Sequence, residues 1–292
     1  MPADDDNLNN KNMKKLVLAI ALIAFMSSSY GQKQTSIQLI RNATVVFRYS
    51  GSEFLIDPML AKKGAYPGFP GTANSNLRNP LVELPVTAES LLEPDAVLLT
   101  HLHPDHWDEA AIKMLSKDKP VLTQNKEDAE IVRNEGFKDV RILSDKSKFK
   151  NIQIQKIHAQ HGSDEAYANP QLAERLGEVS GYFFNEAGQK SVYFVGDAIW
   201  TDSFEAVLKS LKPDVVVLNT GFAQVDGFGA IIMGKEDVLK VHKVLPNATI
   251  VAIHMEAINH CILSRKELAD YVKSNGISKK VIIAADGERI KL

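Results

Sequence analysis

The segment that most constrains this chain is a cluster of histidines directly after an apolar run. Residues Ala96–Thr100 predict a short strand of the kind found in a sheet that is covered on both faces. His101, His103, Asp105 and His106 follow it, so three imidazoles and one carboxylate lie within six residues. Side chains alternate along extended backbone, so His101 and His103 can point the same way. Without a metal, such a cluster would leave buried imidazole nitrogens unpaired, and the segment therefore predicts a metal site.

Composition limits which ligands that metal can have. The chain has one cysteine, Cys261, which excludes an intramolecular disulfide and a zinc site built from several thiolates. We therefore expect imidazole and carboxylate ligands, which Zn²⁺ accepts, and we expect Cys261 to be a small buried hydrophobe. The net charge of -2 lacks the strongly basic footprint of nucleic-acid-binding proteins, so no nucleic-acid partner is expected.

The N-terminal residues predict export. Lys14-Lys15 precede an apolar run over residues 16–26, and small and polar residues follow it. This order is typical of a signal peptide, here 13–31, with residues 1–12 as an upstream extension. The run of 11 residues is too short to span a bilayer comfortably. We expect cleavage near Gln32, a periplasmic or secreted protein, and no stable membrane anchor after cleavage.

The rest of the chain predicts one α/β domain over residues 36–292. Three β-prone runs, Ser36–Ile40, Ala43–Tyr49 and Glu53–Ile56, predict an antiparallel meander. A long irregular stretch from Ala61 to Pro85 follows, and loops of this length are usually functional or mobile. Further strands are expected at 96–100, 120–123, 151–158, 179–184, 191–195, 214–218, 249–253 and 280–284, and helices at 108–115, 126–135, 235–244 and 264–273. This order indicates two sheets with helices outside them.

The histidine segment carries a family resemblance. His101-x-His103-x-Asp105-His106 resembles the HxHxDH motif of the metallo-β-lactamase-fold hydrolase superfamily. The similarity runs from about residue 37 to the C-terminus. It implies an αββα sandwich of two mixed β-sheets flanked by helices. The run from His254 to Cys261 is most similar to the branch that contains ascorbate-6-phosphate lactonase-like proteins.

Single residues farther along the chain follow the order of that family. Asp57 resembles the early aspartate that braces the metal loop, and His161 resembles the third-strand histidine. Asp197 and His254 resemble the aspartate that bridges two metals and the last histidine. His158 lies three residues before His161 and would face the other side of a continuing strand, so we expect His161 to be the ligand.

The resemblance implies two divalent metal ions, with zinc as the first expectation and manganese or iron as alternatives. The expected ligands are His101, His103 and His161 for one ion, Asp105, His106 and His254 for the other, and Asp197 between them. Water held by two cations loses its proton near neutral pH and gives a metal-bound hydroxide nucleophile. Asp105 is expected to orient this nucleophile and move its proton, so Asp105 and Asp197 are the expected catalytic residues.

The expected function is hydrolysis of an ester, lactone or phosphoester in a small molecule. An iron-dependent oxidoreductase on the same fold is one alternative, although its electron-transfer members usually append a flavin domain, which is not expected here. A non-catalytic metal-binding protein is another, and a complete ligand set argues against it. An exported enzyme would rarely meet a cytosolic sugar phosphate, so we expect a substrate other than ascorbate 6-phosphate.

Some residues keep two interpretations. His260 is expected either to contact substrate or support the site, or to be a packed loop residue. Trp107 and Trp200 are expected to pack in the walls of the domain, with a place in the substrate pocket as the alternative. Asn219, at the end of a buried strand, is expected to contribute polar contacts.

Overall fold

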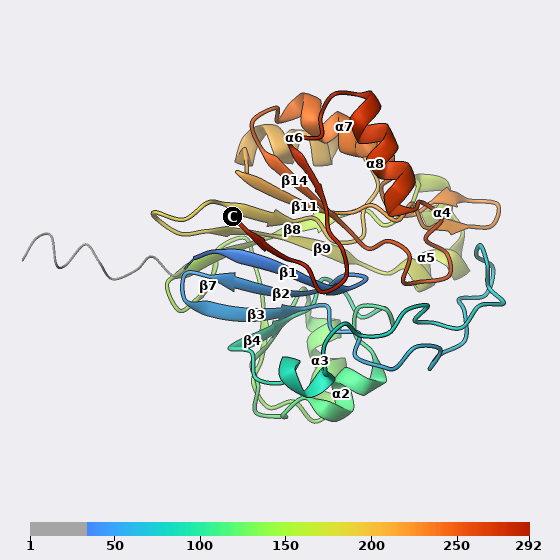
Figure 1. The fold of residues 1–292 in the computed structure, drawn as a ribbon. Coiled ribbons are helices and arrows are strands. Elements are labelled where there is room, and N and C mark those ends of the chain that lie inside the picture. The colour runs from blue at the N-terminus through green and yellow to red at the C-terminus, as the bar shows by residue number, and fades with distance from the viewer. Residues whose placement is uncertain (1–33) are drawn as a thin grey trace, which may run out of the picture. The chain divides into compact units, whose positions relative to one another are not determined.

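The computed structural model describes residues 34–292 as two stacked sheets with helices on their outer faces (Figure 1). This layering confirms the predicted αββα sandwich. The predicted upstream extension, 1–12, and signal peptide, 13–31, lie outside the described residues. No helix within 34–292 is both long enough and apolar enough to cross a membrane.

The first sheet begins with the predicted meander and continues in parallel. Its order is β16-β1-β2-β3-β4-β5-β6, built from β1 (Ser36–Arg41), β2 (Thr44–Tyr49), β3 (Ser52–Ile56), β4 (Ala96–Leu98), β5 (Val121–Thr123), β6 (Val140–Ile142) and β16 (Arg289–Lys291). Strands β16 to β3 are antiparallel, whereas β3 to β6 are parallel. Strand β16 was not predicted; it follows the expected strand at 280–284 and pairs with β1, burying Ile290.

The second sheet is also mixed. Its order is β15-β14-β11-β10-β9-β8-β7, built from β7 (Ser147–Phe149), β8 (Ile152–Ala159), β9 (Val179–Asn185), β10 (Val192–Phe194), β11 (Val215–Asn219), β14 (Thr249–Ile253) and β15 (Val281–Ile283). Strands β10, β11, β14 and β15 are parallel, and β7 to β10 are antiparallel. A small hairpin, β12 (Gln224–Val225) and β13 (Gly229–Ala230), lies outside both sheets.

Aromatic side chains join the two sheets. Phe47 of β2 meets Phe184 of β9 and Phe194 of β10 edge to face, with ring centroids 5.0 and 4.9 Å apart. All three rings are buried, and edge-to-face pairs of this kind add to the hydrophobic stabilisation from area burial. The sheets are therefore packed tightly against each other beneath the site.

Helices cover the outer faces (Figure 1). Those over the first sheet are α2 (Glu109–Met114) and α3 (Lys126–Asn134), and those over the second are α6 (Asp202–Leu211), α7 (Lys235–Val244) and α8 (Arg265–Ser274). The remaining helical turns are η1 (Ala88–Leu91), α4 (Asp164–Ala168) and α5 (Pro170–Leu176). Ser264 and Glu267 form a capping box at the start of α8, which fixes where that helix begins.

Strand direction explains where polar residues gather. Strands β3 and β4 are parallel, so their C-terminal ends open at one edge of the first sheet. Strands β10, β11 and β14 do the same in the second sheet. Strand β8 runs in the same direction as β10, because both are antiparallel to β9. The segments that follow these strands therefore emerge together.

Candidate metal centre

The seven predicted ligand side chains meet where these strand ends converge. The segment after β4 supplies His101, His103, Asp105 and His106; His161 follows β8, Asp197 follows β10 and His254 follows β14. Every one except His103 is buried. Residues more than 150 positions apart in sequence thus share one small volume.

The side chains form two groups. His101, His103 and His161 are one, and Asp105, His106, Asp197 and His254 are the other; within each, the potential ligand atoms lie within 4.8 Å of one another. Asp197 reaches both, because its Oδ2 is 3.2 Å from His106 Nε2 and 3.7 Å from His161 Nε2. The arrangement therefore suits two cations with Asp197 between them.

Backbone carbonyls fix which ring nitrogen is free. His103 Nε2 is 2.7 Å from the carbonyl oxygen of Arg175, and His161 Nδ1 is 2.8 Å from that of Ile231. A carbonyl can only accept, so these ring nitrogens must donate. The other nitrogens, Nδ1 of His103 and Nε2 of His161, keep the lone pair that a metal needs.

Asp57 braces the segment after β4, as predicted. Its carboxylate accepts from the backbone nitrogen and the hydroxyl of Thr100, at 2.8 and 2.7 Å. The same carboxylate lies 2.9 Å from Nδ1 of His106. Asp57 has a positive φ of 45°, a strained conformation for a non-glycine residue, which aims its side chain into the loop.

The two groups differ in whether their imidazoles are protonated near neutral pH. Burial, and after it the imidazole of His161, lowers the pKa of His103 to about 4, so the first group is neutral. Burial alone would also lower the pKa of His106, but Asp197, Asp105 and Asp57 outweigh it and raise that pKa to about 10. The second group therefore attracts positive charge strongly.

Ring nitrogens without a hydrogen-bond partner show whether the site suits cations. His101 Nε2 is fully buried and has no hydrogen-bond partner. His106 Nε2 and His254 Nε2 face each other at 3.1 Å, and Asp105 Oδ2 lies 3.3 Å from the latter. Without a metal, one of these two facing nitrogens must carry a proton to bond to the other, whereas a divalent cation would satisfy nitrogens and carboxylates together. The donor set fits such ions.

Asn42, which sequence reasoning missed, links the two sheets at the site. It lies in the turn between β1 and β2 with φ of 56°, and its carbonyl accepts from the backbone nitrogen of His254 at 3.0 Å. Its side-chain amide donates to the carbonyl of Asp105 at 3.0 Å. An asparagine at a turn position with positive φ was the available signal, but it predicts a turn and not these contacts.

Two further residues contact ligands from outside. Asn219 Nδ2 donates to Asp197 Oδ1 at 2.6 Å, which is the polar contact expected of that residue. Cys261 Sγ lies 3.3 Å from His254 Nδ1. The expectation that Cys261 is a small buried hydrophobe was therefore wrong in part, because the residue is only partly buried and its sulfur contacts a candidate ligand.

The other singled-out aromatic residues pack away from the cluster. His158 is exposed on β8, where it pairs with Ser180. Trp107 donates to Glu135 at 2.8 Å and packs on Phe137, and Trp200 packs edge-on against Phe204. Both tryptophans therefore pack in the walls of the domain, as expected, and neither lines the pocket.

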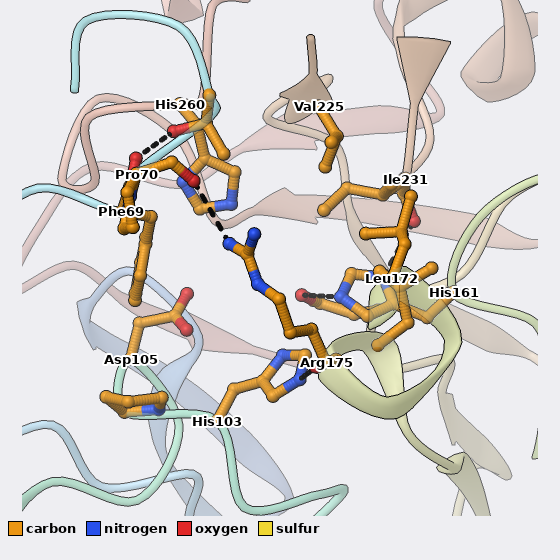
Figure 2. A pocket seen from close by; sticks show the side chains of 14 residues that line it. Phe69, Pro70, His103, Asp105, His161, Leu172, Arg175, Val225, Ile231 and His260 are labelled. Carbon is orange, nitrogen blue, oxygen red and sulfur yellow. Dashed lines mark hydrogen bonds and ion pairs between the residues drawn. The ribbon is translucent and has the colours of Figure 1, made fainter. Parts of the chain in front are cut away.

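A pocket of about 300 Å³ opens over the metal centre, a size suited to a small molecule (Figure 2). Its lining residues are Phe69, Pro70, Thr72, His103, Pro104, Asp105, His161, Leu172, Arg175, Leu176, Asp197, Val225, Ile231 and His260. The upper walls are mostly apolar and come from the 61–85 loop, α5 and the β12–β13 hairpin. Helix α5 was not predicted, although Asn169 caps it and Pro170 begins it, a recognisable start signal.

Asn259 holds the long loop in place as a wall. Its fully buried side chain makes four hydrogen bonds: it accepts from Phe69 N and Asn79 Nδ2, and donates to Thr72 Oγ1 and the Ala73 carbonyl. The irregular stretch is therefore held beside the pocket, which agrees with the functional interpretation of its length and not with the mobile one.

Comparison with known proteins agrees with this geometry. A family model described as the beta-lactamase superfamily domain matches residues 53–255. The UPF0173 protein YddR of Bacillus subtilis is 42% identical over 254 residues, covering 87% of this chain and 98% of that protein. The crystal structure of an isothiocyanate hydrolase from Delia radicum gut bacteria is 49% identical, with a TM-score of 0.87, covering 88% of this chain and 99% of the other. A possible metal-dependent hydrolase from Veillonella parvula DSM 2008 is 42% identical, with a TM-score of 0.87, covering 89% and 100%.

Proposed function

Because this chain belongs to the beta-lactamase superfamily and is a metal-dependent hydrolase, we propose that it uses two divalent ions to hydrolyse small isothiocyanates. One observation carries the proposal: the two ligand groups form the floor of a small, largely apolar pocket. The similarity to an isothiocyanate hydrolase supports the choice of substrate.

Each ligand group would bind one ion. His101, His103 and His161 would hold one, Asp105, His106 and His254 the other, with Asp197 between both. Two such ions lower the pKa of water and stabilise negative charge that develops on the substrate. Zinc suits these nitrogen and oxygen ligands, and manganese and iron remain alternatives.

The chain's own groups position water and move its protons. Hydrolysis of R–N=C=S forms a bond from the water oxygen to the central carbon. It breaks the bonds between that carbon and the nitrogen and gives R–NH₂ and carbonyl sulfide. Both protons of water end on the nitrogen. Asp105 lines the pocket, so its carboxylate faces the place where water would lie beside the substrate. From that position it would accept a proton from the water and return it to the nitrogen.

The pocket walls favour this substrate over a phosphoester. Phe69, Leu172, Leu176, Val225 and Ile231 present apolar surface to the substrate's organic group. Among the lining residues, Arg175 is the only lysine or arginine, and its guanidinium is hydrogen-bonded to the Pro70 carbonyl at 3.0 Å. Phosphate recognition usually uses several cationic or amide donors. An ester or lactone, attacked at carbon in the same way, is the second candidate.

Substrate comparison tests the proposal. Metal-free protein would be reconstituted separately with Zn²⁺, Mn²⁺ and Fe²⁺ and assayed with benzyl isothiocyanate, p-nitrophenyl acetate, a γ-lactone and bis-p-nitrophenyl phosphate. We expect metal-dependent release of benzylamine and carbonyl sulfide, with slower turnover of the other substrates. Efficient turnover of an ester, lactone or phosphoester without isothiocyanate turnover would reject the proposed substrate.

A further inference from the structure

His260 is a buried imidazole in the pocket wall whose hydrogen-bonding capacity is unused. It is 7% exposed, and its Nδ1 is fully buried without a partner. Its ring makes no hydrogen bond to any residue in 34–292. Neither ring nitrogen is used by a protein partner, and the imidazole lines the pocket, so the edge of the ring that faces the pocket is free to bond to a ligand.

The ring is held on the substrate's side of the pocket. Figure 2 shows His260 on the wall opposite His103 and Asp105, with the pocket between them. Phe69 meets the imidazole edge to face, with ring centroids 5.0 Å apart at 86°. A substrate that rests on the metal centre therefore has His260 as its neighbour on the other side.

The backbone next to His260 is fixed from both directions. The carbonyl of His260 accepts from the backbone nitrogen of Gln224, in strand β12 of the hairpin, at 3.3 Å. The preceding residue, Asn259, is tied to the loop that carries Phe69. The imidazole is thus placed in advance, which is what a group that stabilises a transition state requires.

Burial also decides the charge of the ring. It lowers the pKa of His260 to about 4, so the imidazole is neutral near neutral pH and carries one N–H and one lone pair. A neutral imidazole donates a hydrogen bond without bringing a positive charge close to the cations below. This favours stabilisation of partial negative charge over full proton donation.

We propose that His260 is a catalytic residue that donates a hydrogen bond to the substrate heteroatom on which negative charge develops as water adds to the central carbon. The identity of that heteroatom, nitrogen or sulfur of an isothiocyanate, rests on the proposed function. The role of the donor rests on the unpartnered ring facing the pocket.

Two substitutions separate hydrogen bonding from packing. His260→Phe keeps a ring of similar size without a donor, and His260→Gln keeps a donor. With benzyl isothiocyanate and metal-loaded protein, we expect kcat of His260→Phe to fall about 10²-fold, as for the loss of one oxyanion-type donor, and His260→Gln to recover part of it. His158→Phe, on the exposed face of β8, is the matched control and should keep wild-type kcat. Metal content and thermal unfolding are measured for each variant.

The outcomes separate the two proposals. If wild type hydrolyses only an ester or lactone, the isothiocyanate assignment fails, and the same variants on that substrate decide the role of His260. Equal kcat for His260→Phe and wild type, or a change confined to KM, would overturn the catalytic role. If His260→Phe fails to fold or bind metal, ¹⁵N NMR of zinc-loaded wild type with sodium thiocyanate decides. A shift of the His260 ring nitrogens supports the contact, and an unchanged signal at saturating thiocyanate overturns it.

Discussion

Each candidate ligand histidine is oriented by what its other ring nitrogen contacts. His106 is oriented by Asp57, whereas His103 and His161 donate to the carbonyls of Arg175 and Ile231. Such outer partners fix the tautomer and the direction of the ring, so the free nitrogen points at the metal position. The geometry of the site therefore depends on the partner of each ligand histidine as well as on the seven ligand side chains themselves.

Substitution of His161 tests the choice between two nearby histidines. His161→Ala removes one of three ligands in the neutral group, and we expect the loss of about one bound ion per chain, since each site needs about three protein ligands. His158→Ala should keep the wild-type metal content, because His158 is exposed on β8. Inductively coupled plasma mass spectrometry of both variants measures this. The reverse pattern would identify His158 as the ligand.

Substitution of Asp105 tests its proton-transfer role. Asp105→Asn keeps the size and one oxygen but removes the charge and the proton acceptor. We expect kcat to fall by roughly 10²–10⁴, the usual contribution of general acid–base catalysis, with KM little changed. Steady-state kinetics must be accompanied by metal analysis, since a lost ion would mimic the effect. Wild-type turnover with a full metal complement would leave Asp105 as a ligand only.

At the scale of elements, the site depends on strand ends tied to one another. Asp57, after β3, holds Thr100, after β4, and Asn42 in the β1–β2 turn holds the residue after β14. His254 adopts a φ of 64°, which is costly for a non-glycine residue and is maintained by this surrounding structure. The surrounding elements thus hold the backbone in the conformation that directs these side chains into the site.

Asp57 provides a test of this link. The substitution Asp57→Asn keeps the side-chain volume. Its amide, however, cannot accept all the hydrogen bonds that the carboxylate receives from Thr100 and His106. We expect metal affinity to fall about 10–100-fold, as for other outer partners of ligands. Competition with a fluorescent zinc chelator measures it. Asp95→Asn, which alters a bond to β3 at Glu53, is the control and should bind zinc like wild type. Unchanged affinity in Asp57→Asn would contradict the bracing role.

The elements also show what sequence alone can predict. The meander, α7 and β14 were predicted within about two residues, because regular hydrophobic periodicity marks them. Helix α5, the β12–β13 hairpin and β16 were missed, since they are short and are stabilised by contacts with distant segments. The HxHxDH ligands lie within six residues of sequence and could be found. The contacts of Asn42 and Cys261 could not, because they depend on the folded arrangement.

At the scale of the whole molecule, the described fold begins just after the predicted cleavage point. Strand β1 starts at Ser36, so a chain that begins near Gln32 would retain every described element. We propose that the protein is exported to the periplasm or secreted after removal of roughly the first 31 residues, as its basic and apolar N-terminal pattern indicates. N-terminal sequencing of protein from the native host should begin near Gln32. A cytosolic protein that begins at Met1 would contradict export.

The central claim is that the seven clustered ligands hold two ions and that hydrolysis depends on both. Titrating metal-free protein with Zn²⁺ while measuring bound metal and benzylamine release from benzyl isothiocyanate tests it most directly. We predict that activity rises until about two ions are bound per chain and then stays constant, since each ligand group suits one cation. Full activity in metal-free protein, or a plateau at one bound ion with no second binding event, would contradict the account.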